Sequence, residues 1–240
     1  DLIQRLVRRG DRILLGFDFP LGYPEGTAKA LNLNAKEDAP WRAMHDFLCK
    51  EMKDKPDNTN NRFALASRMN RMISDGPFPF WGCPKRDELT TLSVKKARDH
   101  GKKDMPEYRR AELSAIQQKL GRPQPIWKIA YAGAVGGQSL TGIPVVNRLK
   151  AEIDGFKLWP FELPLAPLAK DDLEDVSVVA TEIYPSMRPT IVGDGEIRDE
   201  AQVRIIAEFF AELDEKQRLG ALFSGPKDAS DAAKNAISGE

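Results

Sequence analysis

The feature that most constrains the fold is a short apolar run that ends in one acidic residue. The run Ile13–Phe17 carries no charge, is followed directly by Asp18, and meets Pro20 and Gly22 soon afterwards. A short apolar run bounded by turn-forming residues is typical of a buried β-strand. Because open α/β sheets place their chemistry at the carboxyl ends of strands, this pattern predicts a functional carboxylate at Asp18. The alternative is that Asp18 only caps or braces the turn.

A second run repeats this arrangement later in the chain. The β-branched segment 176–181 ends in Glu182, and Pro185 follows three residues afterwards. Two strands of the same construction, each with one acid near its end, are less expected by chance than either strand alone. The sequence therefore predicts that Glu182 is the partner of Asp18.

Apolar periodicity predicts the other elements. Helices are expected over residues 1–10, 24–31, 38–52, 59–73, 145–153 and 199–213, and a further strand over 156–161. We expect the helix over 199–213 to turn one apolar face inward, made of Val203, Ile206, Ala207 and Phe210.

The composition limits the classes of function. Thirty-six basic residues balance thirty-six acidic ones, so a nucleic-acid site must be a local patch. Cys49 and Cys83 are too few for a disulfide framework and, with two histidines, make a poor zinc site, which favours a reduced, cytoplasmic setting. No apolar run approaches the length of a membrane span. We interpret the chain as a fragment, because it lacks an initiator Met, opens on a helix already under way and stops abruptly after another.

Two segments have the composition of an anion site. The turn Gly136-Gly137-Gln138-Ser139 can present backbone N–H groups to a phosphate, although its glycines do not match the P-loop or dinucleotide spacing. The alternative is that two helices meet closely at these small residues. Arg68 lies at helical spacing from Arg62 and Arg71, and the three arginines either receive an anion or cover a solvated face.

The C-terminal segment carries a pair of acids. Pro226 opens a predicted helix in which Asp228 and Asp231 are three residues apart and share a face. Favourable interaction with the helix dipole explains Asp228 but explains Asp231, one turn further in, less well.

Three motifs together resemble a bacterial family of unknown function. They are Gly16-Phe17-Asp18-Phe19-Pro20-Leu21-Gly22, Glu182-Ile183-Tyr184-Pro185 and Asp228-x-x-Asp231-Ala232, with Gln138–Pro144 similar to the family's middle section. The family is described as predicted nucleases of the ribonuclease H-like fold, and the resemblance covers residues 13–236. It implies one α/β domain over residues 1–240, with a central mixed sheet flanked by helices and a mostly helical insertion at about 36–125.

The chain departs from this family at its beginning. The family's first strands, with the first catalytic Asp, are absent, and the chain opens on what resembles the helix that follows them. Strand Ile13–Phe17 would then present unpaired backbone groups at a sheet edge. We expect that an N-terminal segment of the native protein is missing here, or that a different segment fills its place.

The resemblance implies metal-assisted hydrolysis of a phosphodiester. The implied catalytic residues are Asp18, Glu182, Asp228 and Asp231. Of these, Asp18, Glu182 and Asp231 would hold one or two Mg²⁺ or Mn²⁺ ions, which prefer oxygen ligands. The implied phosphate contacts are Arg68, Lys128, Gly136, Gly137, Gln138 and Ser139. The partner would be nucleic acid or a nucleotide.

Two other functions stay open at this point. A protein of the same fold can bind a nucleotide or cofactor without nuclease activity, its acids then serving structure. An actin-like phosphotransferase would need glycine-rich phosphate loops after a strand, and only residues 133–142 offer anything similar. The sequence gives no indication of the oligomeric state.

Overall fold

The computed structural model describes residues 2–33, 39–101 and 104–225. Its helices are α1 (Leu2–Arg8), α2 (Thr27–Ala30), α3 (Pro40–Glu51), α4 (Arg62–Ser74), α5 (Arg110–Gln117), α6 (Gly136–Glu152) and α7 (Arg198–Glu215). The strands are β1 (Ile13–Phe17), β2 (Phe156–Leu158) and β3 (Val178–Glu182). Short 3₁₀ turns are η1 (Lys85–Asp87), η2 (Asp171–Leu173), η3 (Pro185–Met187) and η4 (Leu219–Ser224).

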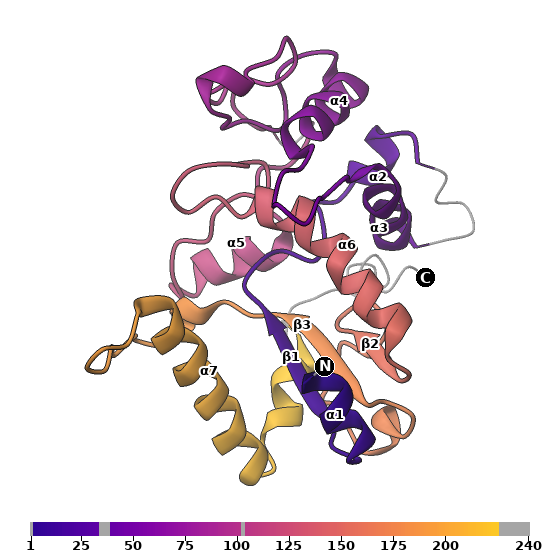
Figure 1. Cartoon of the computed structure of the whole chain (residues 1–240), viewed down its shortest axis with the longest axis vertical. Coiled ribbons are helices and arrows are strands. Elements are labelled where there is room, and N and C mark those ends of the chain that lie inside the picture. The colour runs from indigo at the N-terminus through magenta and orange to yellow at the C-terminus, as the bar shows by residue number, and fades with distance from the viewer. Residues whose placement is uncertain (1, 34–38, 102–103, 226–240) are drawn as a thin grey trace.

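The strands form one small parallel sheet in the order β1-β3-β2, flanked by helices (Figure 1). The chain is therefore a mixed α/β protein, and the strands predicted at Ile13–Phe17 and before Glu182 are confirmed. β2 is shorter than the predicted 156–161 because Pro160 lacks the N–H that would continue the ladder. The antiparallel strands of the expected mixed sheet are not found in the part of the chain that the structure describes.

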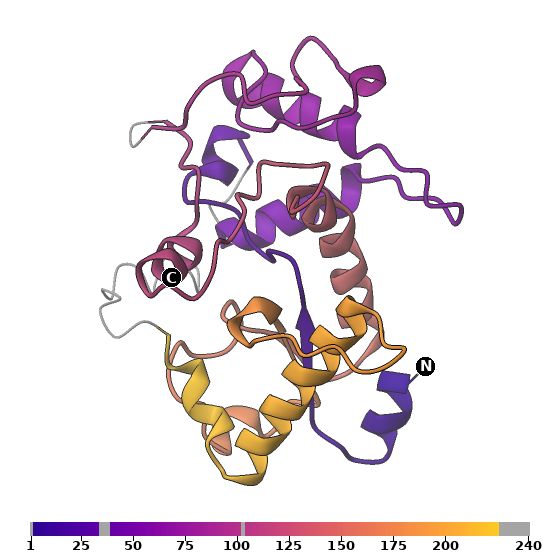
Figure 2. The same ribbon diagram turned by 90° about the vertical axis from the view of Figure 1, so that its left-hand side faces the viewer.

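Side chains alternate between the two faces of β1. Ile13, Leu15 and Phe17 pack with a cluster that includes Val146 of α6 and residues of α1. Leu14 points to the opposite face, where its cluster includes Phe223 of η4. Figures 1 and 2 show the same two layers, with α6 on one side of the sheet and α7 on the other.

Most of the segment between β1 and α6 forms an upper lobe with its own apolar cluster (Figure 1). α3, α4 and the loop after α4 contribute the larger part of this cluster. Leu140 and Ile143 of α6 belong to the same cluster, while Val146 belongs to the cluster under the sheet. α6 thus joins the two lobes.

Two helix predictions need correction. α6 begins at Gly136 rather than at residue 145, because the small residues of its first turn allow it to continue against neighbouring carbonyls. α7 matches the predicted helix, and Ile206 is buried as expected. Val203 is 69% exposed, and Ala207 is exposed as well. All four predicted residues line the groove that faces β1, so the predicted face is correct, but the burial expected of Val203 and Ala207 is wrong.

None of the described helices combines the length and the apolar character that crossing a membrane requires.

Candidate functional site

Asp18 and Glu182 lie at the same end of the sheet. β1 and β3 are parallel neighbours, and Phe17 is the register partner of Glu182. Asp18 therefore sits one residue beyond Glu182 along the strand direction. Because side chains alternate along a strand, Glu182 shares the face of Phe17, whereas Asp18 turns toward α7. The two acids meet at the carboxyl end of the sheet but approach it from opposite faces.

The environment of Asp18 disfavours its negative charge. Partial burial raises the pKa of Asp18 above its ordinary value, and the nearby charges of Glu182 and Asp199 raise it further. Asp199 is in the first turn of α7, and nothing in the sequence connected it with Asp18. No hydrogen bond or ion pair to the Asp18 carboxylate is found among residues 2–33, 39–101 and 104–225. A cation at this point would relieve the repulsion.

Glu182 differs from Asp18 in having a buried cationic partner. The Nη2 atom of Arg109 lies 2.7 Å from Oε1 of Glu182, and Nε of Arg109 lies 2.9 Å from Oε1 of Glu112. The exposed fractions of these side chains are 13% for Arg109, 7% for Glu112 and 33% for Glu182. Burial alone would lower the pKa of Arg109, but the two carboxylates raise it above the ordinary value, so the guanidinium stays charged.

Sequence reasoning missed Arg109 and Glu112. Their local signal was present, because a Glu three residues after a helix N-cap is typical of a capping box, and Glu112 accepts the Arg109 backbone N–H at 2.7 Å. No sequence pattern indicates the ion pair between Arg109 and Glu182, since the two residues are 73 positions apart. Tyr23 was missed as well. Its buried hydroxyl has no hydrogen-bond partner among the described residues, and burial raises its pKa.

The described residues supply two of the three predicted metal ligands. Asp228 and Asp231 lie outside the described residues, so their relation to Asp18 and Glu182 stays a prediction. Within the described ranges, no group of three or more His, Cys, Asp or Glu side chains is arranged to hold a metal ion. Asp18 and the Glu182 oxygen that does not bind Arg109 fit a divalent cation only if a further ligand joins them.

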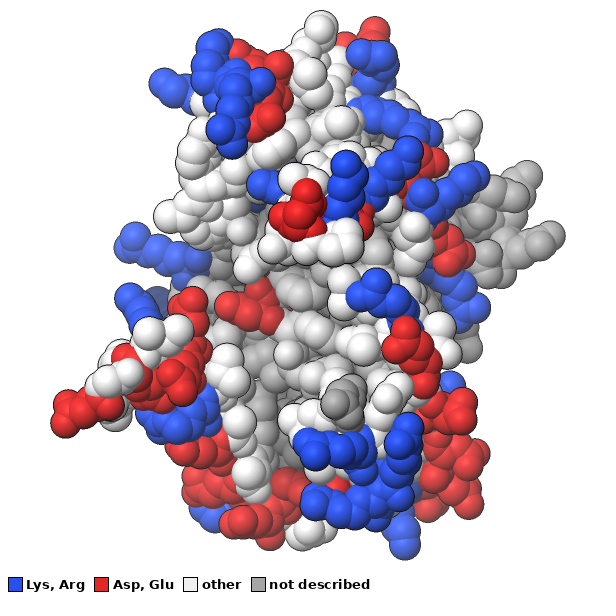
Figure 3. Space-filling view, viewed as in Figure 1, with Lys and Arg blue, Asp and Glu red and all other residues white. Residues whose placement is uncertain are grey.

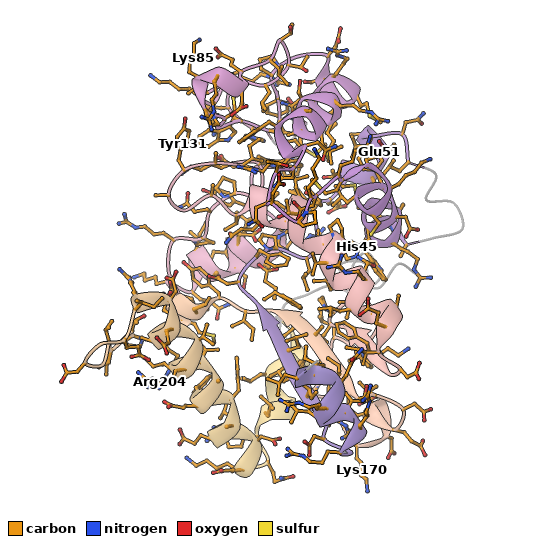
Figure 4. The ribbon with its side chains drawn as sticks, viewed as in Figure 1. His45, Glu51, Lys85, Tyr131, Lys170 and Arg204 are labelled. Atoms are coloured by element: carbon orange, nitrogen blue, oxygen red, sulfur yellow. The ribbon has the colours of Figure 1, made fainter. Side chains whose placement is uncertain are left out.

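The predicted phosphate contacts Arg68 and Lys128 already have partners in the upper lobe. Arg68 pairs with Glu51, and Figure 4 shows Glu51 beside α4, in the lobe opposite α7. Lys128 donates from Nζ to the carbonyl of Ala132 at 2.7 Å. Neither side chain is in contact with the ends of β1 and β3.

The predicted Gly136–Ser139 turn is the first turn of α6, and its small residues serve close packing. A Cβ on Gly136 would lie 1.9 Å from the carbonyl oxygen of Ile126, and one on Gly137 would lie 2.5 Å from that of Ile129. The Ser139 hydroxyl donates to the carbonyl of Pro20 at 2.8 Å. Gln138 is exposed. Close approach thus accounts for both glycines, although the partner is a loop and not a second helix.

A groove of about 950 Å³ runs between β1 and α7. Asp18 stands at one end, and Arg12 lies toward the other. Leu14, Gly16 and Val203 are also in its wall. Ile13 donates to Ser177 and Phe17 accepts from Ile183, so the backbone groups of Leu14 and Gly16 point away from β3. β1 is therefore an edge strand within the described sheet.

Charge is distributed unevenly over the face of the molecule that Figure 3 shows. Figure 3 shows acidic side chains around α7 and a cluster of basic ones over α1. No continuous basic track crosses the described part of this face, in keeping with the equal numbers of acidic and basic residues.

Comparison with protein-family models, with curated proteins and with solved structures found no significant match.

Proposed function

We propose that this protein is a metal-dependent hydrolase of phosphodiesters, a nuclease with a ribonuclease H-like fold. The observation that carries the proposal is the pair Asp18 and Glu182 at the carboxyl ends of two adjacent parallel strands. That edge of an α/β sheet is where ligands bind. The negative charges of Glu182 and Asp199 both act on Asp18, which is the electrostatic condition for recruiting a divalent cation.

Each residue of the proposed site has a different role. Asp18 is without a bonded partner among the described residues and offers its carboxylate to Mg²⁺ or Mn²⁺. Arg109 holds Glu182 through one oxygen, and the other oxygen has no partner among the described residues. Asp231 would complete the ligand set. When bound, the ion supplies an activated water and stabilises the leaving oxygen. Glu112 keeps Arg109 in place from its other side.

A second candidate is a nucleotide- or cofactor-binding protein without hydrolytic activity. The ion pair between Arg109 and Glu182 favours it, because a carboxylate that already has a cationic partner binds a metal less strongly. An actin-like phosphotransferase has less support. Gly136 and Gly137 pack against the carbonyls of a loop, and no strand of the described chain leads directly into them.

Hydrolysis of labelled nucleic acid tests the proposal. Single-stranded DNA, duplex DNA and RNA are incubated with the protein in Mn²⁺ and in EDTA, and products are separated by size. We expect cleavage of at least one substrate in Mn²⁺ and none in EDTA. Asp18→Asn should slow cleavage at least about a hundredfold, because even groups that only support metal ligands cost 10–100-fold.

Asp154→Asn is the matched control, since Asp154 is an exposed acid just before β2, at the opposite end of the sheet. It should leave the rate unchanged. Cleavage that persists in EDTA, or that is equal in the two variants, would contradict the proposal. Metal-independent binding of a nucleotide without any cleavage would support the second candidate.

A further inference from the structure

A separate hollow of about 440 Å³ lies at the start of α7. It is lined by Ser186, Arg188, Thr190, Val192 and Arg198. Residues that line this hollow are close in sequence to the carboxylates of the proposed site. Ser186 follows Glu182 by four residues, and Arg198 directly precedes Asp199, whose charge acts on Asp18. The hollow therefore adjoins the proposed active site.

The lining has the chemistry of an anion site. Arg188 and Arg198 provide guanidinium groups that bind phosphate through two parallel hydrogen bonds, and the hydroxyls of Ser186 and Thr190 provide further donors. In the part of the chain that the structure describes, no carboxylate lies within ion-pair distance of either arginine. The two charges are thus available to a ligand.

Two of the acids nearby have other partners. Glu196 is bound by Arg204 at 2.8 Å and accepts the backbone N–H of Gly193 at 2.9 Å, and Figure 4 shows Arg204 on α7. Glu212 is bound by Lys216, which lowers its pKa, and Arg188 contributes more weakly from a distance. Asp199 and Glu200, in the first turn of α7, have no ion-pair partner among the described residues, and neither lies within ion-pair distance of Arg188 or Arg198.

α7 contributes to the placement of both arginines. The guanidinium carbon of Arg188 lies 4.7 Å from the centroid of the Phe209 ring, a distance that gives a favourable cation–π contact. Arg198 is the first residue of this 18-residue helix, whose N-terminus adds partial positive charge.

We infer that this hollow binds a phosphate group of a nucleic-acid strand, next to the phosphodiester that faces Asp18 and Glu182. The inference rests on the proposed function. Acidic residues repel a polyanion, so the site needs fixed cations beside it, and Arg68 and Lys128 are engaged elsewhere. The hollow of about 440 Å³ has room for a phosphate and its sugar.

Binding of a fluorescent 12-nucleotide DNA strand in EDTA tests the inference without requiring hydrolysis. Fluorescence anisotropy gives the Kd of the full chain at several salt concentrations. Arg188→Gln and Arg198→Gln should each weaken binding about tenfold, and the double variant about fiftyfold or more, since each removes a charge-assisted contact. The slope of log K against log salt should fall by about 0.7 for each lost phosphate contact. Inorganic phosphate at millimolar concentration should compete with the strand.

The double variant Lys50→Gln/Arg86→Gln is the matched control, because it removes the same charge from exposed positions in the upper lobe. It should change Kd less than threefold. Equal losses in the two double variants, or no binding of the strand to the unaltered protein at low salt, would overturn the inference. Circular dichroism confirms that each variant is folded. If the strand binds through the arginines but is never cut in Mn²⁺, the proposed hydrolysis fails while this inference stands.

Discussion

Arg109 joins two acids that are 70 residues apart in the sequence, so its replacement tests how the site is held together. Arg109→Met keeps a side chain of similar length and apolar character while removing the charge. Glu112 and Glu182 would then face each other without the guanidinium that separates them. Breaking a buried ion pair from one side costs about 3–5 kcal/mol. For a chain of this size that lowers Tm by about 6–20 °C.

The two acids should contribute unequally to this loss. Glu112 is the more deeply buried, so Glu112→Gln in the Arg109→Met background should restore the larger share of stability, and Gln can still accept the N-cap N–H. Glu182 is one-third exposed, so Glu182→Gln should restore no more than about 1 kcal/mol.

Urea unfolding monitored by circular dichroism measures these changes. Arg68→Met is the control, because the pair with Glu51 is a surface contact in which Arg68 is 53% exposed, and its loss should cost at most about 1 kcal/mol. If Arg109→Met costs no more than Arg68→Met, or if Glu182→Gln rescues more than Glu112→Gln, the account of a buried, central Arg109 is refuted.

Three further predictions concern the sheet and its surroundings. Because the pKa of Asp18 is raised in the folded protein, its stabilising contribution is complete below its ordinary value of 3.8 and is lost as the pH rises through the folded pKa. Asp18→Asn should therefore be more stable than the unaltered protein at pH 7, by less than about 1 kcal/mol for this half-exposed side chain, and equal to it below pH 3.8. A stability difference that is independent of pH would contradict this. Gly136→Ala should lower the free energy of unfolding by about 3 kcal/mol or more, because its Cβ would meet a backbone carbonyl. Gly76→Ala is the control, since the nearest neighbour of its Cβ lies at 3.8 Å, and it should change stability by less than about 0.5 kcal/mol. Similar values for both variants would refute the packing argument. In amide hydrogen exchange followed by NMR, Leu15 and Phe17 should be protected and Leu14 and Gly16 should not, and protection of Leu14 would show that another segment covers this edge.

The sequence predicted the strands well because their signals are local. Ile13–Phe17 and the run before Glu182 carry apolar and β-branched residues that end at turn formers, and the structure confirms both. Parallel pairing then brings Asp18 and Glu182 to one edge, as predicted. The one-residue offset that turns them to opposite faces depends on strand register, and no local pattern in either run encodes that register.

Longer-range contacts escaped prediction for the same reason. Arg109 belongs to a capping box that its own neighbourhood explains, and only the fold brings it to Glu182. The start of α6 was misplaced because Gly-Gly disfavours a helix locally, and the energy that overrides this preference comes from packing against the Ile126 and Ile129 carbonyls. Local rules also predicted burial for Val203 and Ala207, which face β1 across the groove but stay exposed, because the depth of the packing between α7 and the sheet has no local signal.

The central claim is that Asp18 and Glu182 belong to one cation site, and a calorimetric titration with Mn²⁺ at pH 7.5 tests it most directly. We predict binding with a Kd between micromolar and millimolar that Asp18→Asn and Glu182→Gln each weaken at least tenfold and that Asp154→Asn leaves unchanged. Absence of Mn²⁺ binding, or binding that all three variants retain equally, would contradict the claim.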